Sequence, residues 1–105
     1  MKVYIQRKNG IVDAVAEYDV ETKSCTVLKG SIVSSSIAQS AKFRGAASIE
    51  KARKDTVKNN KVIVDVPFKS ASTAANYVTV TSTNGLVAWK NEKGQSIKDI
   101  IKEDE

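Results

Sequence analysis

The sequence lacks histidine and contains only one cysteine among its 105 residues. Histidine is the commonest general base at neutral pH and the commonest metal ligand, and structural zinc sites are built from several cysteines and histidines. Because Cys25 has no partner for an internal disulfide, a disulfide-stapled secreted scaffold is excluded. We therefore expect no metal site and no cofactor.

Motifs for nucleophilic or phosphate chemistry are absent as well. The sequence has no G-x-S-x-G elbow, and Lys29-Gly30-Ser31 lacks the glycine spacing of a phosphate-binding loop and fits a bulged strand instead. Glu17 and Asp19 lie two positions apart on one strand face, which is typical of an ordinary solvated surface. Lysine-based catalysis needs only spatial neighbours and stays open, but no residue is singled out. We expect a protein that is not an enzyme.

Long hydrophobic runs are missing too. No apolar stretch is long enough for a signal peptide or for a bilayer-spanning helix. Hydrophobic residues make up 41% of the sequence, which is enough for a small core. We expect one domain over residues 1–105, in the cytoplasm and without membrane contact.

Positive charge, by contrast, is abundant and concentrated in the middle of the chain. The net charge is +5, and residues 42–69 alone carry eight basic and three acidic residues, 8 − 3 = +5. This basic segment suggests an anionic partner, most simply a nucleic-acid backbone. A solvated helix face that keeps the protein soluble explains the charge equally well. The candidate nucleic-acid-binding residues are Lys42, Arg44, Lys51, Arg53, Lys54, Lys58, Lys61 and Lys69.

The first third of the sequence predicts an antiparallel meander. Strands are expected at residues 3–5, 12–18 and 25–33, with turns at Asn9-Gly10 and over residues 19–24. The apolar residues at 12, 14, 16 and 18 alternate with Asp13, Val15 and Glu17, as in a half-buried strand. Gly30 predicts either a bulge in the third strand or a close approach of another backbone segment.

The remainder predicts helices with strands between them. An amphipathic helix is expected over about residues 41–59, stopped by Asn59-Asn60, and then a strand over 61–66 that ends at Pro67. A short Ala-rich helix follows Ser70 or Ser72, although residues 77–81 have strand propensity. Asn84-Gly85 predicts a tight turn before a strand over 86–90, and residues 91–94 predict another turn. A last helix begins after Ser96 with Ile97, Ile100 and Ile101 facing inward. The fold class is α+β, with an antiparallel β-meander, an amphipathic central helix, a short Ala-rich helix and a C-terminal helix packed on the sheet.

Trp89 is the largest side chain in a sequence with few aromatic residues. A core made mainly of Val, Ile and Ala needs a large group to reach native packing density, so we expect Trp89 to be buried. The alternative is a partly exposed ring that stacks on a base or a peptide.

Several short motifs occur in an order that resembles the domain-of-unknown-function family 4357. They are Phe68-Lys69-Ser70-Ala71-Ser72-Thr73-Ala74-Ala75, then Asn84-Gly85, Trp89 and Gly94, with Val27-Leu28-Lys29-Gly30-Ser31 upstream and Arg53 as an arginine before a helix. The resemblance covers about residues 25–101. Ala71 replaces a frequent proline, Leu86 replaces a frequent aromatic residue, and the usual glycine between Val78 and Thr83 is absent. The motif residues are Gly30, Phe68, Ser70, Ser72, Ala74, Ala75, Asn84, Gly85, Trp89 and Gly94.

The motif residues suggest structural roles. Ser72 can open the Ala-rich helix, and Ala74 and Ala75 allow close packing of that helix on the sheet. Asn84-Gly85 tolerates the positive φ of a tight turn, and Trp89 can close the core over Phe68.

The resemblance implies an accessory module for DNA transactions rather than a nuclease. Members of that family are commonly fused to GIY-YIG nuclease modules or lie near restriction-modification proteins. The family is also similar to the restriction-enzyme adenine-methylase-associated domain. The implied partners are DNA and a nuclease or methylase protein. The alternative is a protein-interaction or structural module that meets a peptide at a sheet edge or a groove beside Trp89.

Overall fold

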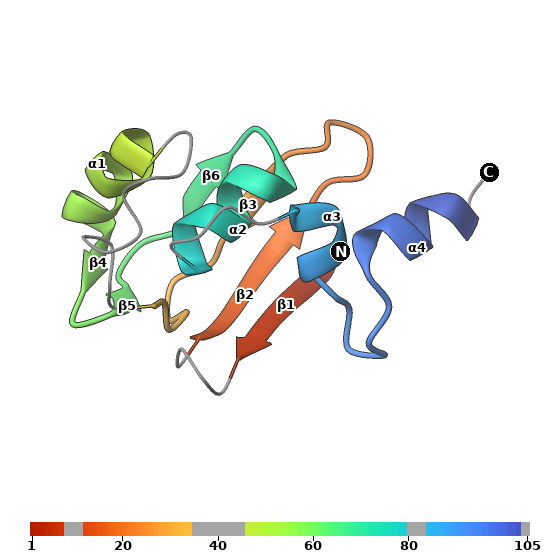
Figure 1. Ribbon diagram of the computed structural model, residues 1–105, viewed down its shortest axis with the longest axis horizontal. Coiled ribbons are helices and arrows are strands. Elements are labelled where there is room, and N and C mark those ends of the chain that lie inside the picture. Colours follow the sequence, from red (N-terminus) through yellow and green to blue (C-terminus); the bar gives the residue numbers. More distant parts are fainter. Residues whose placement is uncertain (8–11, 35–45, 80–83, 104–105) are drawn as a thin grey trace.

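The computed structural model describes residues 1–7, 12–34, 46–79 and 84–103. Four strands form an antiparallel sheet in the order β1-β2-β3-β6 (Figure 1). The Ala-rich helix packs on one face of this sheet, which confirms the predicted α+β class. The central and C-terminal helices lie toward the two ends of the molecule, and the C-terminal helix packs mainly against the short helix at residues 85–88 rather than on the sheet as predicted (Figure 1). The Asn9-Gly10 turn lies outside the described residues. The strands of the sheet are β1 (Lys2–Arg7), β2 (Val12–Tyr18), β3 (Cys25–Val27) and β6 (Val66–Phe68).

Strand β2 has the predicted bounds because its alternation matches a sheet with one buried face. Val12, Ala14, Ala16 and Tyr18 are buried, and the residues between them are exposed or half-buried. In the register with β1, Val3 lies opposite Ala16, so apolar residues meet on the inner face. An antiparallel sheet can keep its other face in water, as this one does.

The third strand is shorter than predicted. Strand β3 ends at Val27, and Gly30 follows with a φ of +95°, where glycine is favoured. The side chain of the buried Ser31 takes the place of a strand partner here. Its Oγ accepts from the Val15 N–H at 3.0 Å and lies 2.8 Å from the Leu28 carbonyl oxygen. Ile32 then rejoins β2 through a bridge to Asp13.

The central helix α1 (Ala46–Thr56) ends earlier than predicted, and residues 41–45 lie outside the description. Asn59-Asn60 does not stop a helix. Both residues have positive φ values, 54° and 63°, as in the type I′ turn of a two-residue hairpin. This turn joins β4 (Val57–Lys58) to β5 (Lys61–Val62). Because Val62 is fully buried, tertiary packing overrides the helical continuation.

The strand predicted over residues 61–66 is divided between β5 and β6. Pro67 lies inside β6 rather than after it, paired with Thr26 of β3. Strand β6 is an edge of the four-stranded sheet, and edge strands tolerate proline because a ladder bond is not required on both sides.

Helix α2 (Ala71–Thr79) is the Ala-rich helix, and it packs against β2, β3 and β6. Its N-cap is Ser70, whose Oγ accepts from the Thr73 N–H at 3.1 Å. The last helix, α4 (Ile97–Glu103), begins after Ser96 as predicted, and Ser96 Oγ accepts from the Asp99 N–H at 3.2 Å. Ile97 is buried, while Ile100 and Ile101 are half-buried.

The predicted Asn84-Gly85 turn and the strand after it are both wrong. Residues Gly85–Ala88 form a short helix, α3, and Asn84 is its N-cap with a φ of −77°. The backbone of Gly85 does not have a positive φ, so its conformation does not require glycine. Glycine is needed there because α3 lies very close to α2, and a Cβ at this position would lie 2.1 Å from the Ala71 carbonyl carbon. Ser72 does not cap α2 but accepts from the Gly85 N–H at 3.0 Å.

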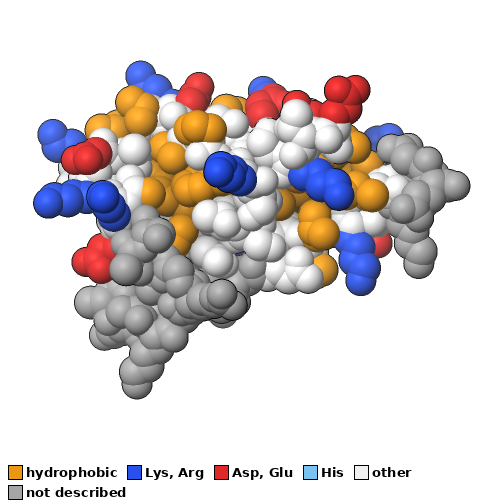
Figure 2. Space-filling view, turned by 90° about the horizontal axis from the view of Figure 1, so that it is seen from above, with side chains coloured by type: hydrophobic (Ala, Val, Ile, Leu, Met, Phe, Trp, Pro, Cys, Tyr) orange, Lys and Arg blue, Asp and Glu red, His pale blue; other side chains and the backbone are white. Residues whose placement is uncertain are grey.

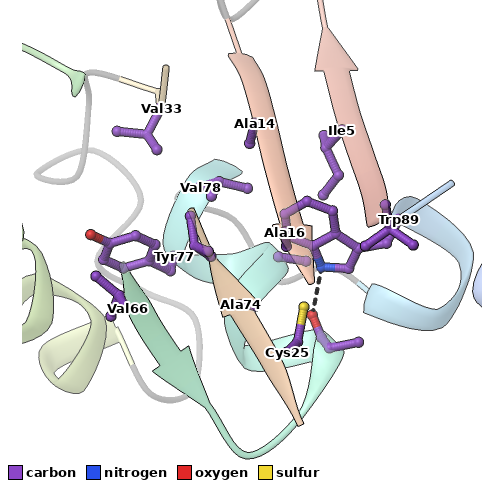
Figure 3. Close-up of a cluster of buried hydrophobic side chains, with 14 of the residues drawn as sticks. Ile5, Ala14, Ala16, Cys25, Val33, Val66, Ala74, Tyr77, Val78 and Trp89 are labelled. Atoms are coloured by element: carbon purple, nitrogen blue, oxygen red, sulfur yellow. Dashed lines mark hydrogen bonds between the residues drawn. The ribbon is translucent and has the colours of Figure 1, made fainter. Parts of the chain in front are cut away.

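Trp89 is fully buried, which confirms the expected core position (Figure 3). Its indole N–H donates to the Ala71 carbonyl oxygen at 2.9 Å, drawn as a dashed line in the figure. Phe68 is only half-buried, and its ring meets that of Tyr77 with centroids 5.0 Å apart.

Lys90 then pairs with the outer edge of β1. The Tyr4 N–H donates to the Lys90 carbonyl oxygen at 2.7 Å, and the Lys90 N–H donates to the Tyr4 carbonyl oxygen at 3.0 Å. The turn predicted over residues 91–94 is present, with Gly94 at a φ of +82°.

Candidate functional site

The structure describes six of the eight basic residues that the sequence singled out. Lys42 and Arg44 lie outside the described residues. Lys51 and Lys54 are exposed on α1, Lys58 and Lys61 on the β4–β5 hairpin, and Lys69 after β6. Arg53 is the exception, because only 8% of it is exposed.

Arg53 is therefore not available to a nucleic acid, which corrects its inclusion among the binding residues. One of its terminal nitrogens donates to the Tyr77 carbonyl oxygen at 3.4 Å, and the other donates to the Ser34 carbonyl oxygen. Tyr77 lies in the last turn of α2, where carbonyl groups without intrahelical partners attract cations. Burial lowers the pKa of the Arg53 guanidinium below its ordinary value, yet arginine stays protonated at neutral pH. Arg53 is thus a structural cation.

A second contact joins the same two helices. The Thr56 hydroxyl, in the last residue of α1, shares a hydrogen bond with the Tyr77 hydroxyl. Burial raises the pKa of Tyr77 above its ordinary value, so the phenol stays protonated. The burial of Arg53 could have been predicted from the sequence. Arg53 lies four positions after Ile49, and therefore on the apolar face of the helix, where Ile49 is buried.

The exposed lysines of α1 have acidic neighbours on the same helix surface. Glu50 lies four positions before Lys54, and Asp55 lies four positions after Lys51. Residues at this spacing are adjacent on a helix, so each carboxylate offsets part of a lysine's charge. Helix α1 alone presents a mixed surface.

The β4–β5 hairpin presents positive charge without such compensation. Lys58 and Lys61 are directly paired across the two strands, and both are exposed. Directly opposed residues have Cβ atoms about 5 Å apart, and like charges there are destabilising. Among the described residues, no carboxylate lies within 4 Å of either ammonium group, and the one ion pair joins the Met1 amino group to Glu17.

Backbone hydrogen bonds fix this hairpin to the segment that follows β3. The Gly30 N–H donates to the Val62 carbonyl oxygen, and the Val62 N–H donates to that of Ser31, both at 2.8 Å. The Val33 N–H donates to the Asn60 carbonyl oxygen in the turn itself, also at 2.8 Å. Because Ile32 bridges both Asp13 and Lys61, the lysine pair has a rigid connection to the main sheet.

Of the basic residues that the structure describes in this segment, Arg53 alone is withdrawn from the surface. Five exposed lysines and three exposed acids remain between residues 46 and 69, 5 − 3 = +2. Figure 2 shows basic side chains at the left end, where α1 and the hairpin lie in Figure 1, with acidic ones between them. The hairpin tip, with two lysines and two asparagines, is the most positive feature among these described residues.

The family-motif residues are mainly structural. Gly30 and Gly94 occupy turns, Ser70 and Asn84 cap helices, and the remaining motif residues pack α2 and α3 together or onto the sheet. Ala74, Ala75, Gly85 and Trp89 are buried, and Phe68 is half-buried. The motif residues thus maintain the fold.

A second surface feature lies between α3 and α4. An open hollow of about 500 Å³ is lined by Val87, Lys90, Gly94, Ser96, Lys98 and Asp99. Leu86 and Val87 on α3 are 37% and 48% exposed. Of these two residues, Val87 lines the hollow, and an exposed aliphatic side chain in a hollow is a feature of peptide-binding surfaces.

The described part of the chain offers no cluster of side chains suited to a metal ion. Cys25 is fully buried, and burial raises the pKa of its thiol to about 12, so the thiolate that would act as nucleophile or ligand does not form at neutral pH. Within the helices that the structure describes, none is long and apolar enough to cross a membrane.

Comparison with known families gives a match over almost the whole chain. The family model described as Domain of unknown function (DUF4357) matches residues 4–101, further toward the N-terminus than the motifs alone indicated. No curated protein and no solved structure matches the chain. The chain belongs to the DUF4357 family.

Proposed function

We propose that this DUF4357 domain binds the phosphate backbone of a nucleic acid through its β4–β5 hairpin and performs no chemical step itself. The observation that supports this most is the opposed pair Lys58 and Lys61, which raises the energy of the free protein without a compensating carboxylate nearby. A bound polyanion removes that repulsion. Lys51 and Lys54 on the adjacent helix extend the positive surface.

The rigid attachment of the hairpin favours such binding. Because the strands are already fixed to the main sheet, little backbone entropy is lost on association. A few phosphate contacts give sequence-independent dissociation constants of about 10⁻⁴ to 10⁻⁶ M at physiological salt. Binding of this strength suits an accessory module whose specificity comes from a partner.

The chemical reaction would belong to that partner. The family resemblance connects such domains to nucleases and to DNA-modification systems, and a nuclease or methylase is the partner we propose. In this arrangement the domain increases the local concentration of nucleic acid near the partner's active site.

A titration of labelled duplex DNA at two salt concentrations tests the proposal. The informative variant is the double change Lys58→Gln and Lys61→Gln, and its matched control is Lys93→Gln with Lys98→Gln, which lowers the net charge equally at exposed positions elsewhere. We expect the hairpin variant to lose affinity and its salt slope to fall by about two, one per lost phosphate contact. The control should keep most of its slope.

Two results would contradict the proposal. Absence of binding by the parent protein at low salt removes nucleic acid as the partner. Equal losses in the two double variants would show that net charge acts without regard to position, so the hairpin would not be the site.

The hollow between α3 and α4 favours a second candidate function, in which the domain binds a peptide of a partner protein. The exposed Leu86 and Val87 would then provide the apolar contact. A polar change at Val87, such as Val87→Ser, should release that partner, while the Lys58 and Lys61 changes should not. Co-purification of the two variants with a co-expressed nuclease or methylase subunit distinguishes the two functions.

A further inference from the structure

Two exposed aliphatic residues, Ile63 and Val64, follow the β4–β5 hairpin in the chain. Ile63 is 39% exposed and Val64 is 47% exposed, in the segment between β5 and β6. The Ile63 N–H donates to the Thr56 carbonyl oxygen at 2.8 Å, so the pairing of the hairpin extends to Ile63. Neither residue contributes to the buried core cluster.

Strand alternation places Ile63 on the same side of the hairpin as the lysine pair. Lys61 is exposed, Val62 is fully buried and Ile63 is exposed again, as expected when successive side chains point to opposite faces. Lys58 lies directly opposite Lys61. The outer face of the hairpin thus presents two cations and, immediately beside them, a branched aliphatic side chain.

This combination suits a partner whose charged backbone surrounds an apolar interior. A double helix has that chemistry, with phosphates outside and stacked bases inside. Proteins that deform DNA often insert an apolar side chain between base steps while basic residues hold the flanking phosphates. The cost of insertion is smallest where stacking is already weakened.

We infer that Ile63 acts as a wedge at a base step, so that the hairpin prefers duplexes with a locally weakened stack. This inference rests on the proposed function and specifies its substrate class. Lys58 and Lys61, which both lie on the turn side of Ile63, contact phosphates beside the weakened step. Ile63 occupies the space between the separated bases.

The test compares an intact duplex with one of the same length that carries a single central mismatch. The parent protein should bind the mismatched duplex about tenfold more tightly, because one stacked step contributes on the order of a factor of ten to the duplex equilibrium. The Ile63→Ser variant should lose that preference, while its affinity for the intact duplex should change less than about twofold. A 2-aminopurine base at the central step should brighten on binding of the parent protein, since unstacking relieves its quenching.

Two variants control for size and for surface hydrophobicity. Ile63→Leu should retain the preference because it remains aliphatic and bulky. Val20→Ser should also retain it, since Val20 is similarly exposed, at 43%, but lies in the turn between β2 and β3. Thermal melting should show all three variants to be folded, because each change is at an exposed position.

The possible failures of the two proposals are distinguishable. Salt-dependent binding without a mismatch preference, or an undiminished preference in Ile63→Ser, overturns the wedge and leaves the lysine contact in place. Absence of binding to either duplex at low salt overturns both. A preference that Val20→Ser also abolishes would overturn the wedge, because position would then be irrelevant.

Discussion

The core around Trp89 and the α1–hairpin region, residues 46–62, differ in how well their side chains are paired. In the core, apolar side chains are fully buried and the indole N–H of Trp89 has a partner. In the α1–hairpin region, exposed lysines oppose each other with no nearby carboxylate among the residues described. The comparison shows where this small protein is optimised for packing and where it retains charge at a cost in stability.

Three buried side chains connect the two regions. Ile49 and Val62 contribute to the common hydrophobic cluster, and Arg53 extends from α1 to the end of α2. The exposed charges are therefore held on a rigid support. Changes in each region should affect different quantities, stability in one and binding in the other.

The largest expected effect is that of Trp89→Ala. Removing a fully buried tryptophan should lower the free energy of unfolding by about 3–5 kcal/mol, a large fraction of the total for a domain of this size. Denaturant unfolding followed by circular dichroism measures the loss. The milder Trp89→Phe variant, which removes the indole donor, should lose less. A variant that melts with the parent would show that Trp89 does not support the core.

The second effect separates two adjacent cations. Arg53→Ala leaves the buried Tyr77 carbonyl group and the part-buried Ser34 carbonyl group without this donor. An unsatisfied buried group costs about 1–3 kcal/mol, so we expect a loss of at least that size. The neighbouring Lys54→Ala changes the same net charge at an exposed position and should shift stability by less than about 0.5 kcal/mol. Urea midpoints of the two variants provide the comparison. Equal midpoints would show that Arg53 contributes no more to stability than an exposed lysine, and would contradict its structural role.

A third, pH-dependent effect arises in the core. Burial raises the pKa of Cys25 to about 12, above the value of 9.0 for an exposed thiol. Between these values the folded protein retains a proton that the unfolded chain releases. Stability is therefore fully present below about pH 9 and decreases as the pH rises toward 12, by at most about 1.4 kcal/mol per pH unit.

Unfolding midpoints of the parent and Cys25→Ala proteins at about pH 8 and pH 10 test this effect. The parent should lose more stability than the variant over that interval. Identical pH dependence in the two proteins would show that the buried thiol does not contribute.

The smallest expected effect is a gain in stability. Lys58→Glu converts the opposed lysines into an opposite-charge pair, which should stabilise the hairpin by about 0.2–1 kcal/mol. The same change should weaken nucleic-acid binding. Lys93→Glu, at an exposed position in the turn before α4, should leave the hairpin unaffected. A Lys58→Glu variant with reduced stability would show that the lysine pair is not strained.

The sequence predicted those elements whose signals are local. Strand β2 and the cap of α4 at Ser96 follow from alternation and from side-chain chemistry within a few residues. The burial of Trp89 follows from the scarcity of other large groups. Each of these predictions needed only nearby residues or the overall composition.

The errors arose where distant residues decide the local structure. Residues 85–88 alternate like a strand, but the close contact of Gly85 with Ala71 and its bond to Ser72 make them a helix. Asn59-Asn60 forms the turn of a hairpin instead of ending a helix, because the hairpin allows Val62 to be buried. Within the candidate site, exposure of the α1 and hairpin lysines was predictable, but the opposition of Lys58 and Lys61 required the hairpin itself.

The pairing of Tyr4 with Lys90 also affects how the chain folds during synthesis. On the outer edge of β1, Tyr4 exchanges two hydrogen bonds with Lys90, which is synthesised 86 residues later, 90 − 4 = 86. Until Lys90 emerges, that edge exposes unpaired N–H and C=O groups that can recruit other nascent chains. A nascent chain that ends before residue 90 lacks this cover for Tyr4, and we expect it to aggregate more readily than the full domain.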